Sequence, residues 1–326
     1  MRGLAMFAFL GCVLVSGPGA ATGEPPLRLE AKIPLGKVEG RLDHLAVDLV
    51  RRRLFVAELG NGSVGVIDLP EGKVIRAIHG LREPQGVAYE ASTNTLYVTT
   101  AGDGSMRLFA GTELKPAGKI ALGEDADNIR VDAAHGRVLI AYGNGAIASI
   151  DPGTRAKAGV MILDGHPEGF QTEGTRIFAN VPDARHIAVF EAGEIAGRTR
   201  WRFGETGRNF PLVIDIDNER LLTVTRGRAE LLSFDLANGA LLSRTAACDD
   251  ADDAFIDAKR HRVYVSCGEG FLDVFAQGNG YERIARIPTA QGARTSFFSP
   301  TLDRLYLAVR ATAREPAAIW IYQPSP

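Results

Sequence analysis

The feature that most constrains this chain is a strand pattern that returns about every forty-two residues. Each copy places a large residue at the centre of a short run of β-forming residues, as in Arg53–Ala57 and Thr95–Thr99. The seven central residues are Phe55, Tyr97, Leu139, Phe178, Leu222, Tyr264 and Tyr306. A repeat of this length is typical of the blades of a β-propeller.

Further apolar strands flank each central strand, and glycine turns such as Asn61-Gly62 separate them. The seventh unit ends after its third strand at Tyr322, whereas residues Leu27–Ile33 form a strand with no partner of its own. Pairing the two removes an exposed sheet edge. The sequence therefore predicts an all-β, seven-bladed β-propeller whose last blade is completed by the N-terminal strand. Two stacked sandwiches are the rival, but a sandwich has no reason to repeat so regularly.

The first residues have the features of a secretory signal peptide. Met1-Arg2-Gly3 is followed by the apolar run Leu4–Val15 and then by small residues up to Gly23. The apolar run is shorter than the roughly twenty residues that span a bilayer, so we expect no membrane span. We predict a signal peptide over residues 1–23, one propeller domain over 24–326, and a periplasmic or secreted protein. Lipidation at Cys12 is the less favoured alternative, because Phe9 fits a lipoprotein signal poorly.

The amino-acid composition and net charge indicate which classes of partner the protein can bind. The 326 residues are 45% hydrophobic and 23% charged, which is ordinary for a globular protein. A formal net charge of −2 gives no overall reason to bind nucleic acid. We expect a monomer whose partner is a small molecule or another protein.

Two cysteines, Cys248 and Cys267, remain after removal of the predicted signal peptide. In an oxidising compartment they are candidates for a disulfide, and two separately buried thiols are the alternative. No C-x-x-C or C-x-x-C-H motif is present, which excludes covalent haem attachment through such a motif.

Candidate binding residues stand where the innermost strand of each blade begins. In a propeller these seven positions converge on the mouth of the central channel. The residues there differ from blade to blade although the repeat strands stay alike, which indicates a site: Asp43, His44, Gln85, Asp127, Asn128, His166, Glu168, Asn209, Asp252, Asp253 and Arg294. The alternative is a polar channel that holds only water. Crowded carboxylates are expected to have raised pKa values unless a cation offsets their repulsion.

Metal binding is left open by these residue types. Carboxylate and amide oxygens suit calcium, whereas two histidines with carboxylates suit zinc, manganese or iron. No G-x-S-x-G elbow and no nucleotide-binding glycine loop is present. No cofactor other than a divalent cation is expected.

The repeat resembles that of the YncE-like periplasmic propellers, also called the YVTN repeat family. The tetrapeptide stands here as Tyr97-Val98-Thr99-Thr100, and in weaker form as Tyr264-Val265-Ser266-Cys267. The resemblance spans the chain after the signal peptide and implies a binding or interaction scaffold.

A more distant likeness, by residue type alone, is to the calcium-dependent lactonase propellers, similar to gluconolactonase. Those hold a divalent ion in the channel with Glu, Asn and Asp, which implies Glu168, Asn209 and Asp252 or Asp253 as ligands.

Three functions follow as expectations. The first is binding, without catalysis, of a small cationic, sugar-like or metal-containing ligand, or of a partner's loop, at an acidic channel mouth. The second is a metal-dependent hydrolase or lactonase in which Glu168, Asn209 and Asp253 hold the ion and His166 or Asp43 is the base. The third is an interaction module that uses the outer rim.

Overall fold

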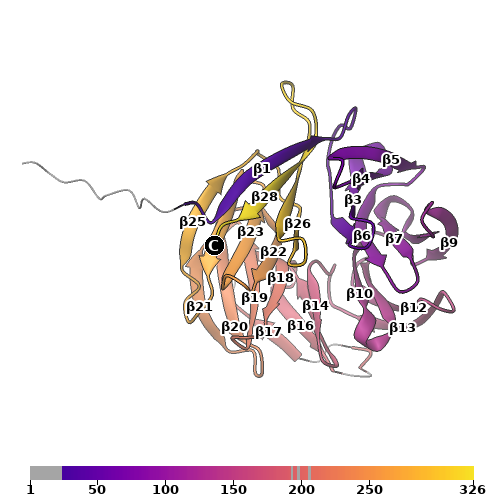
Figure 1. Ribbon diagram of the computed structural model, residues 1–326. Helices are drawn as coiled ribbons and strands as arrows, with labels where there is room; N and C mark the ends of the chain where they lie inside the picture. Colours follow the sequence, from indigo (N-terminus) through magenta and orange to yellow (C-terminus); the bar gives the residue numbers. More distant parts are fainter. Residues whose placement is uncertain (1–23, 192–193, 197–198, 205–206) are drawn as a thin grey trace, which may run out of the picture.

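Seven four-stranded antiparallel sheets surround a central axis in the computed structural model (Figure 1). The structure describes residues 24–191, 194–196, 199–204 and 207–326. The predicted seven-bladed β-propeller is confirmed. The predicted signal peptide, residues 1–23, lies outside the described residues.

Each blade is numbered along the chain, and its strands run from the channel outward. The first three blades are β2 (Leu45–Asp48), β3 (Arg53–Glu58), β4 (Ser63–Asp68) and β5 (Lys73–His79); β6 (Pro84–Glu90), β7 (Thr95–Thr100), β8 (Ser105–Ala110) and β9 (Lys115–Ala121); and β10 (Ala126–Asp132), β11 (Arg137–Tyr142), β12 (Ala146–Asp151) and β13 (Ala156–Ile162). Three 3-10 turns, η1 (Leu59–Asn61), η2 (Ala101–Asp103) and η3 (Ala133–His135), lie in connections of these blades.

The next three blades follow the same order. They are β14 (Phe170–Glu173), β15 (Arg176–Val181), β16 (His186–Phe190) and β17 (Thr199–Arg202); β18 (Arg208–Asp215), β19 (Arg220–Arg226), β20 (Glu230–Asp235) and β21 (Leu241–Ala246); and β22 (Ala251–Asp257), β23 (Arg262–Cys267), β24 (Phe271–Ala276) and β25 (Arg283–Pro288). Within the described ranges no helix is long and apolar enough to cross a membrane.

Blade 7 is built from both ends of the chain, as predicted. It consists of β26 (Ser296–Ser299), β27 (Arg304–Val309), β28 (Ala318–Pro324) and the N-terminal strand β1 (Leu27–Pro34) as the outermost strand. In Figure 1 the indigo strand β1 lies against the yellow strand β28. Their antiparallel pairing runs from Leu27 opposite Pro324 to Pro34 opposite Ala318, so every sheet has four strands.

The core lies between neighbouring blades. The repeated central residues are buried there, and Phe55, for example, packs in one cluster with Leu96 and Val98 of the next blade. β-branched and aromatic residues pack well on such pleated surfaces, which explains why the repeat strands consist largely of them. The innermost strands are thereby held at fixed positions around the axis.

The innermost strands end in an acidic residue in six of the seven blades. These residues are Asp48, Glu90, Asp132, Glu173, Asp215 and Asp257, and Ser299 takes the place in blade 7. We call this end of the channel the hairpin end, because each strand turns here into the next one. Asp257 shows the role of these residues: its Oδ2 accepts hydrogen bonds from the Tyr264 hydroxyl (2.6 Å) and from the Arg260 guanidinium (3.0 Å). The acid closes the turn and satisfies the buried tyrosine of the repeat.

Candidate functional site

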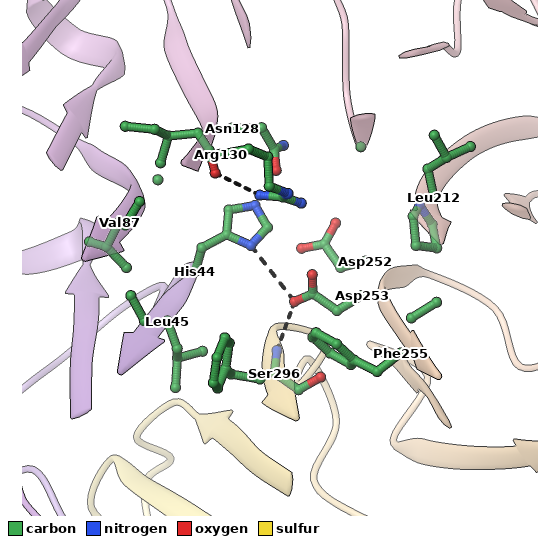
Figure 2. Close-up of a pocket in the computed structure, with 18 of the residues that line it drawn as sticks. His44, Leu45, Val87, Asn128, Arg130, Leu212, Asp252, Asp253, Phe255 and Ser296 are labelled. Atoms are coloured by element: carbon green, nitrogen blue, oxygen red, sulfur yellow. Dashed lines mark hydrogen bonds and ion pairs between the residues drawn. The ribbon is translucent and has the colours of Figure 1, made fainter. Parts of the chain in front are cut away.

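A cavity of about 270 Å³ lies on the axis and is lined by residues from all seven blades. Figure 2 shows part of its wall, with His44, Asn128, Arg130, Asp252 and Asp253 pointing toward a common space. The wall also includes the polar residues Glu168, Gln171 and Ser296. Most of the remaining wall is apolar or aromatic, and includes Val47, Val87, Tyr89, Val131, Leu212, Phe255 and Phe297. The cavity therefore combines charged groups with an apolar surface.

The predicted residues take equivalent positions at the end of the channel where the innermost strands begin, which we call the mouth. Counted back five residues from the last residue of each innermost strand, as Asp127 is from Asp132, the blades present Asp43, Gln85, Asp127, Glu168, Phe210, Asp252 and Arg294. Six of these seven were predicted from the sequence. His44, Asn128 and Asp253 follow one residue later, and all three line the cavity.

His44 connects blade 1 to blade 6. Its Nδ1 lies 3.7 Å from Oδ2 of Asp253, and its Nε2 lies 3.8 Å from Oδ1 of Asp43. Oδ2 of Asp253 also accepts a hydrogen bond from the backbone N–H of Ser296 in blade 7 (2.8 Å). Burial opposes the imidazolium charge, but the neighbouring carboxylates outweigh burial and raise the pKa of His44 to about 10. At neutral pH His44 is a cation paired with Asp253.

Asp252 is held by two arginines from the blades on either side. Arg226 of blade 5 donates to its Oδ1, and the Nε of Arg294 in blade 7 lies 3.3 Å from its Oδ2. The guanidinium of Arg226 also stacks 3.5 Å above the ring of Phe210. Burial would raise the pKa of Asp252, yet the two guanidinium groups outweigh burial and hold that pKa below its usual value. Asp252 is therefore an ionised and neutralised carboxylate.

His166 lies at the entrance of blade 4. Its Nδ1 is 2.6 Å from the carbonyl oxygen of Gly143, and its Nε2 is 3.9 Å from Oδ2 of Asp127. Burial lowers the pKa of His166, but the neighbouring Asp127 carboxylate and the hydrogen bond to the Gly143 carbonyl outweigh burial and raise that pKa to about 9. Gln85 takes part in the same rim, because its amide donates to Asp125 (3.4 Å) and accepts from Arg41 (3.4 Å).

Two buried carboxyls of the mouth have raised pKa values. Burial, with the negative charges of Asp127 and Asp252, raises the pKa of Glu168 to about 8. Burial raises the pKa of Asp43 to about 7, although Arg41 lies 2.7 Å from it. The expected effect of crowded acids on pKa therefore appears at these two residues, whereas cations prevent it at Asp252. The mouth holds both signs of charge, so its predicted acidic character is offset by arginine and histidine.

The implied metal ligands are not brought together. Glu168 and Asp253 line the cavity, but Asn209 does not. The Asn209 amide is fully buried and donates to Oδ1 of Asn180 (2.6 Å) and to the carbonyl of His186 (3.0 Å). Across the ranges that the structure describes, no three His, Cys, Asp or Glu side chains are grouped to hold a metal ion. The residues present do not fit a Glu168, Asn209 and Asp253 metal site.

Three arginines of the site were not predicted. Arg41 precedes the first mouth residue, Arg226 ends the second strand of blade 5, and Arg130 stands two residues after Asn128 on β10. Arg130 could have been predicted from the sequence, because an arginine inside a strand that lines the channel has no place in an apolar core. Arg226 could not have been predicted, since only the folded structure brings its strand next to Asp252.

Hydrogen bonds from the preceding blade fix the backbone at the mouth. The Thr99 hydroxyl of blade 2 donates to the carbonyl of Asp127 in blade 3, and the Asn180 amide of blade 4 donates to the carbonyl of Phe210 in blade 5 (2.9 Å). Gly86 is required at this contact, because a Cβ there would lie 2.2 Å from the Asp127 carbonyl oxygen. The mouth residues are thus positioned by neighbouring blades and not by their own strand alone.

Cys248 and Cys267 form a disulfide, which was one of the two sequence alternatives. Their Cα atoms are 5.9 Å apart. The bridge joins the segment that enters blade 6 to the end of β23, next to the strand that carries Asp252 and Asp253. It cross-links the chain beside the mouth.

Comparison with known proteins shows the fold. No family model and no curated protein matches the sequence. Among solved structures, the chain is similar to one from Kuenenia stuttgartiensis hydrazine synthase, with a TM-score of 0.74 and 16% identity over 88% of this chain and 98% of that chain. It is also similar to a chain of a mitotic checkpoint complex, with a TM-score of 0.76 and 13% identity over 96% of this chain and 98% of that one. At these identities the likeness shows a shared β-propeller fold and no more.

Proposed function

We propose that this chain is a binding protein that holds a small organic molecule in the central channel. The observation that carries the proposal is the cavity on the axis, which all seven blades help to line and where charged side chains stand beside apolar ones. Binding pockets combine an apolar wall with a few fixed polar groups. Here the polar groups lie at the mouth and the apolar wall continues behind them.

The size of the cavity favours a small molecule over a partner's loop. At about 270 Å³ it lies near the lower end of ligand pockets, which measure roughly 300 to 1,000 Å³. Polar groups are also left unpaired there. Oδ1 of Asn128 is buried without a hydrogen bond. The Glu168 carboxyl makes no hydrogen bond or ion pair with a described residue, whereas its backbone N–H donates to the Asn180 carbonyl (3.0 Å). Unpaired buried groups cost free energy unless a ligand or water satisfies them.

Export from the cytoplasm is part of the same proposal. It is supported by the apolar run Leu4–Val15 and by the disulfide, since disulfides persist in oxidising compartments. Kinship with the YncE-like propellers is proposed on the Tyr97–Thr100 tetrapeptide and the repeat. Secretion is tested by expressing the full chain in a bacterium and fractionating the cells: a periplasmic product shortened near residue 23 is expected, and a full-length cytoplasmic product contradicts export.

Binding is tested by filling the channel. Ala88 lines the cavity, so Ala88→Phe should occupy part of its volume, while Ala91→Phe places the same ring on an exposed position. Native mass spectrometry of protein purified from cells, with thermal unfolding against a library of small metabolites, should show a ligand for the wild type and for Ala91→Phe but not for Ala88→Phe. Equal binding by all three proteins would contradict the channel as the site, and Ala46→Leu repeats the test with a smaller group.

A further inference from the structure

We propose that the ligand is a small aromatic monocarboxylate, with its carboxylate on Arg130 and its ring against Phe255 and Phe297. The inference rests on the proposed function and names the ligand class of the same cavity. It follows from which charged groups of the wall already have partners and which do not.

The carboxylates that line the cavity are already neutralised, with one exception. Asp252 is paired with Arg226 and Arg294, and Asp253 is paired with His44. Glu168 is the exception, and its proton is retained at neutral pH because its pKa is about 8. The acids of the wall therefore leave no free negative charge for a cationic ligand to neutralise.

Arg130 is the cation that remains. Its guanidinium lines the cavity, and its one hydrogen bond within the described chain goes to the carbonyl of Ile129 (2.8 Å). A guanidinium offers five N–H donors in a planar fork that matches a carboxylate with two parallel hydrogen bonds. Burial without a carboxylate partner within ion-pair distance is costly for such a group, and an anionic ligand removes that cost.

The wall across the channel from Arg130 is aromatic. Arg130 belongs to blade 3, whereas Phe255 and Phe297 belong to blades 6 and 7, on the far side of a seven-blade ring. The two rings meet edge to face with centroids 6.2 Å apart. Arg130, Phe255 and Phe297 stand at the same distance from the ends of their strands, so they lie at one depth in the channel. A flat apolar body with one carboxylate fits between them.

The mouth offers no partner to a second negative charge on the ligand. Asp252 and Asp253 lie above this level, and the cations beside them, Arg226, Arg294 and His44, are already paired with them. A second carboxylate pointing outward would be buried without an opposite charge, which is costly. The preferred ligand is therefore a monocarboxylate rather than a dicarboxylate.

The test compares three probes of one shape: 3-phenylpropanoate, 3-phenylpropan-1-ol and 3-phenylpropylamine, measured by calorimetry on residues 24–326 at pH 7. The wild type should bind the acid at least tenfold more tightly than the alcohol or the amine. Arg130→Gln should lose that tenfold preference, and Arg130→Lys should retain part of it. Arg137→Gln is the matched control, because Arg137 pairs with Asp132 at the hairpin end.

Three sets of results overturn the inference and are distinguishable. If the alcohol or amine binds the wild type as tightly as the acid, and Ala88→Phe abolishes that binding, the ligand class is wrong but channel binding stands. If no probe binds at millimolar concentration, the aromatic carboxylate class is excluded, and the metabolite screen above decides the proposed function on its own. A preference for the acid that persists in a folded Arg130→Gln protein also excludes the assigned partner.

Discussion

The two ends of the channel are built from the same strands in opposite ways. At the hairpin end nearly every innermost strand finishes with an acid that accepts hydrogen bonds from its own turn, as Asp257 does from Arg260 and Tyr264. At the mouth the equivalent positions hold Asp, Gln, Glu, Phe and Arg, and their contacts run between blades. Residues that recur in nearly every blade therefore serve the fold, whereas positions at which the residue differs between blades form the site.

The ends also differ in how completely their carboxylate and amide oxygens are satisfied. Asp257 and Asp215 accept hydrogen bonds from buried tyrosine hydroxyls, at 2.6 and 2.8 Å. At the mouth, one carboxylate oxygen of Asp127 and the amide oxygen of Asn128 are buried without a partner. Buried oxygens that all accept hydrogen bonds stabilise the fold, whereas buried oxygens without a donor are available to a ligand.

The largest difference is expected between Asp257→Ala and Asp127→Ala. Asp257→Ala leaves the buried Tyr264 hydroxyl without an acceptor and removes one of the two carboxylate partners of Arg260, the other being Asp303, and should lower the free energy of unfolding by about 4 kcal/mol. Asp127→Ala removes only a 3.9 Å contact with His166 and should cost about 1 kcal/mol. Urea unfolding measures both. Equal losses would mean that the mouth is as structural as the hairpin end.

The disulfide is the next largest contribution. Reduction of Cys248–Cys267 removes a cross-link between residues nineteen apart and should lower the free energy of unfolding by about 3 kcal/mol. Denaturant unfolding with and without reductant measures the change, and the Cys248→Ala, Cys267→Ala double variant should not respond to reductant. A wild type that is equally insensitive would show that the bridge does not stabilise blade 6.

A pH-dependent effect is expected at Glu168. Between its ordinary pKa near 4.5 and its raised pKa of about 8, the folded protein keeps a proton that the unfolded chain has lost, so this group makes stability fall as pH rises. Glu168→Gln removes that dependence and should raise the free energy of unfolding at pH 9 by about 2 kcal/mol, with little effect at pH 4. Glu173→Gln at the hairpin end is the control. A wild-type pH profile unchanged by Glu168→Gln would contradict the assigned proton.

The smallest effect is expected at Thr99. Its hydroxyl accepts from the Gly86 N–H (2.8 Å) and donates to the Asp127 carbonyl, so Thr99→Val should cost about 1 kcal/mol of unfolding free energy. Because the hydroxyl positions the mouth, ligand affinity should fall as well. Thr99→Ser retains the bonds and should restore both quantities, and a valine variant with wild-type affinity would show that the mouth does not depend on this contact.

The repeat made the fold and the register of the mouth predictable, because a fixed period places equivalent residues at equivalent positions. Asp43, Asp127, Glu168, Asp252 and Arg294 were found in this way. Contacts between blades were not predictable, since they depend on side-chain direction. Asn209 stands one residue before Phe210, which takes the mouth position of blade 5, and its amide donates into the blade contact with Asn180. The pairing of Arg226 with Asp252 could not be predicted from the residues around either of them.

The pairing of β1 with β28 sets the order in which the molecule can be completed. Among the strands of the propeller, β1 comes earliest in the chain, yet its partner follows almost three hundred residues later, with Leu27 opposite Pro324. Until β28 exists, β1 has no sheet to join, and blades 1 and 7 cannot meet. The ring is thus finished only after synthesis of its last blade, and a nascent chain must keep its leading strand from pairing with a neighbour in the meantime.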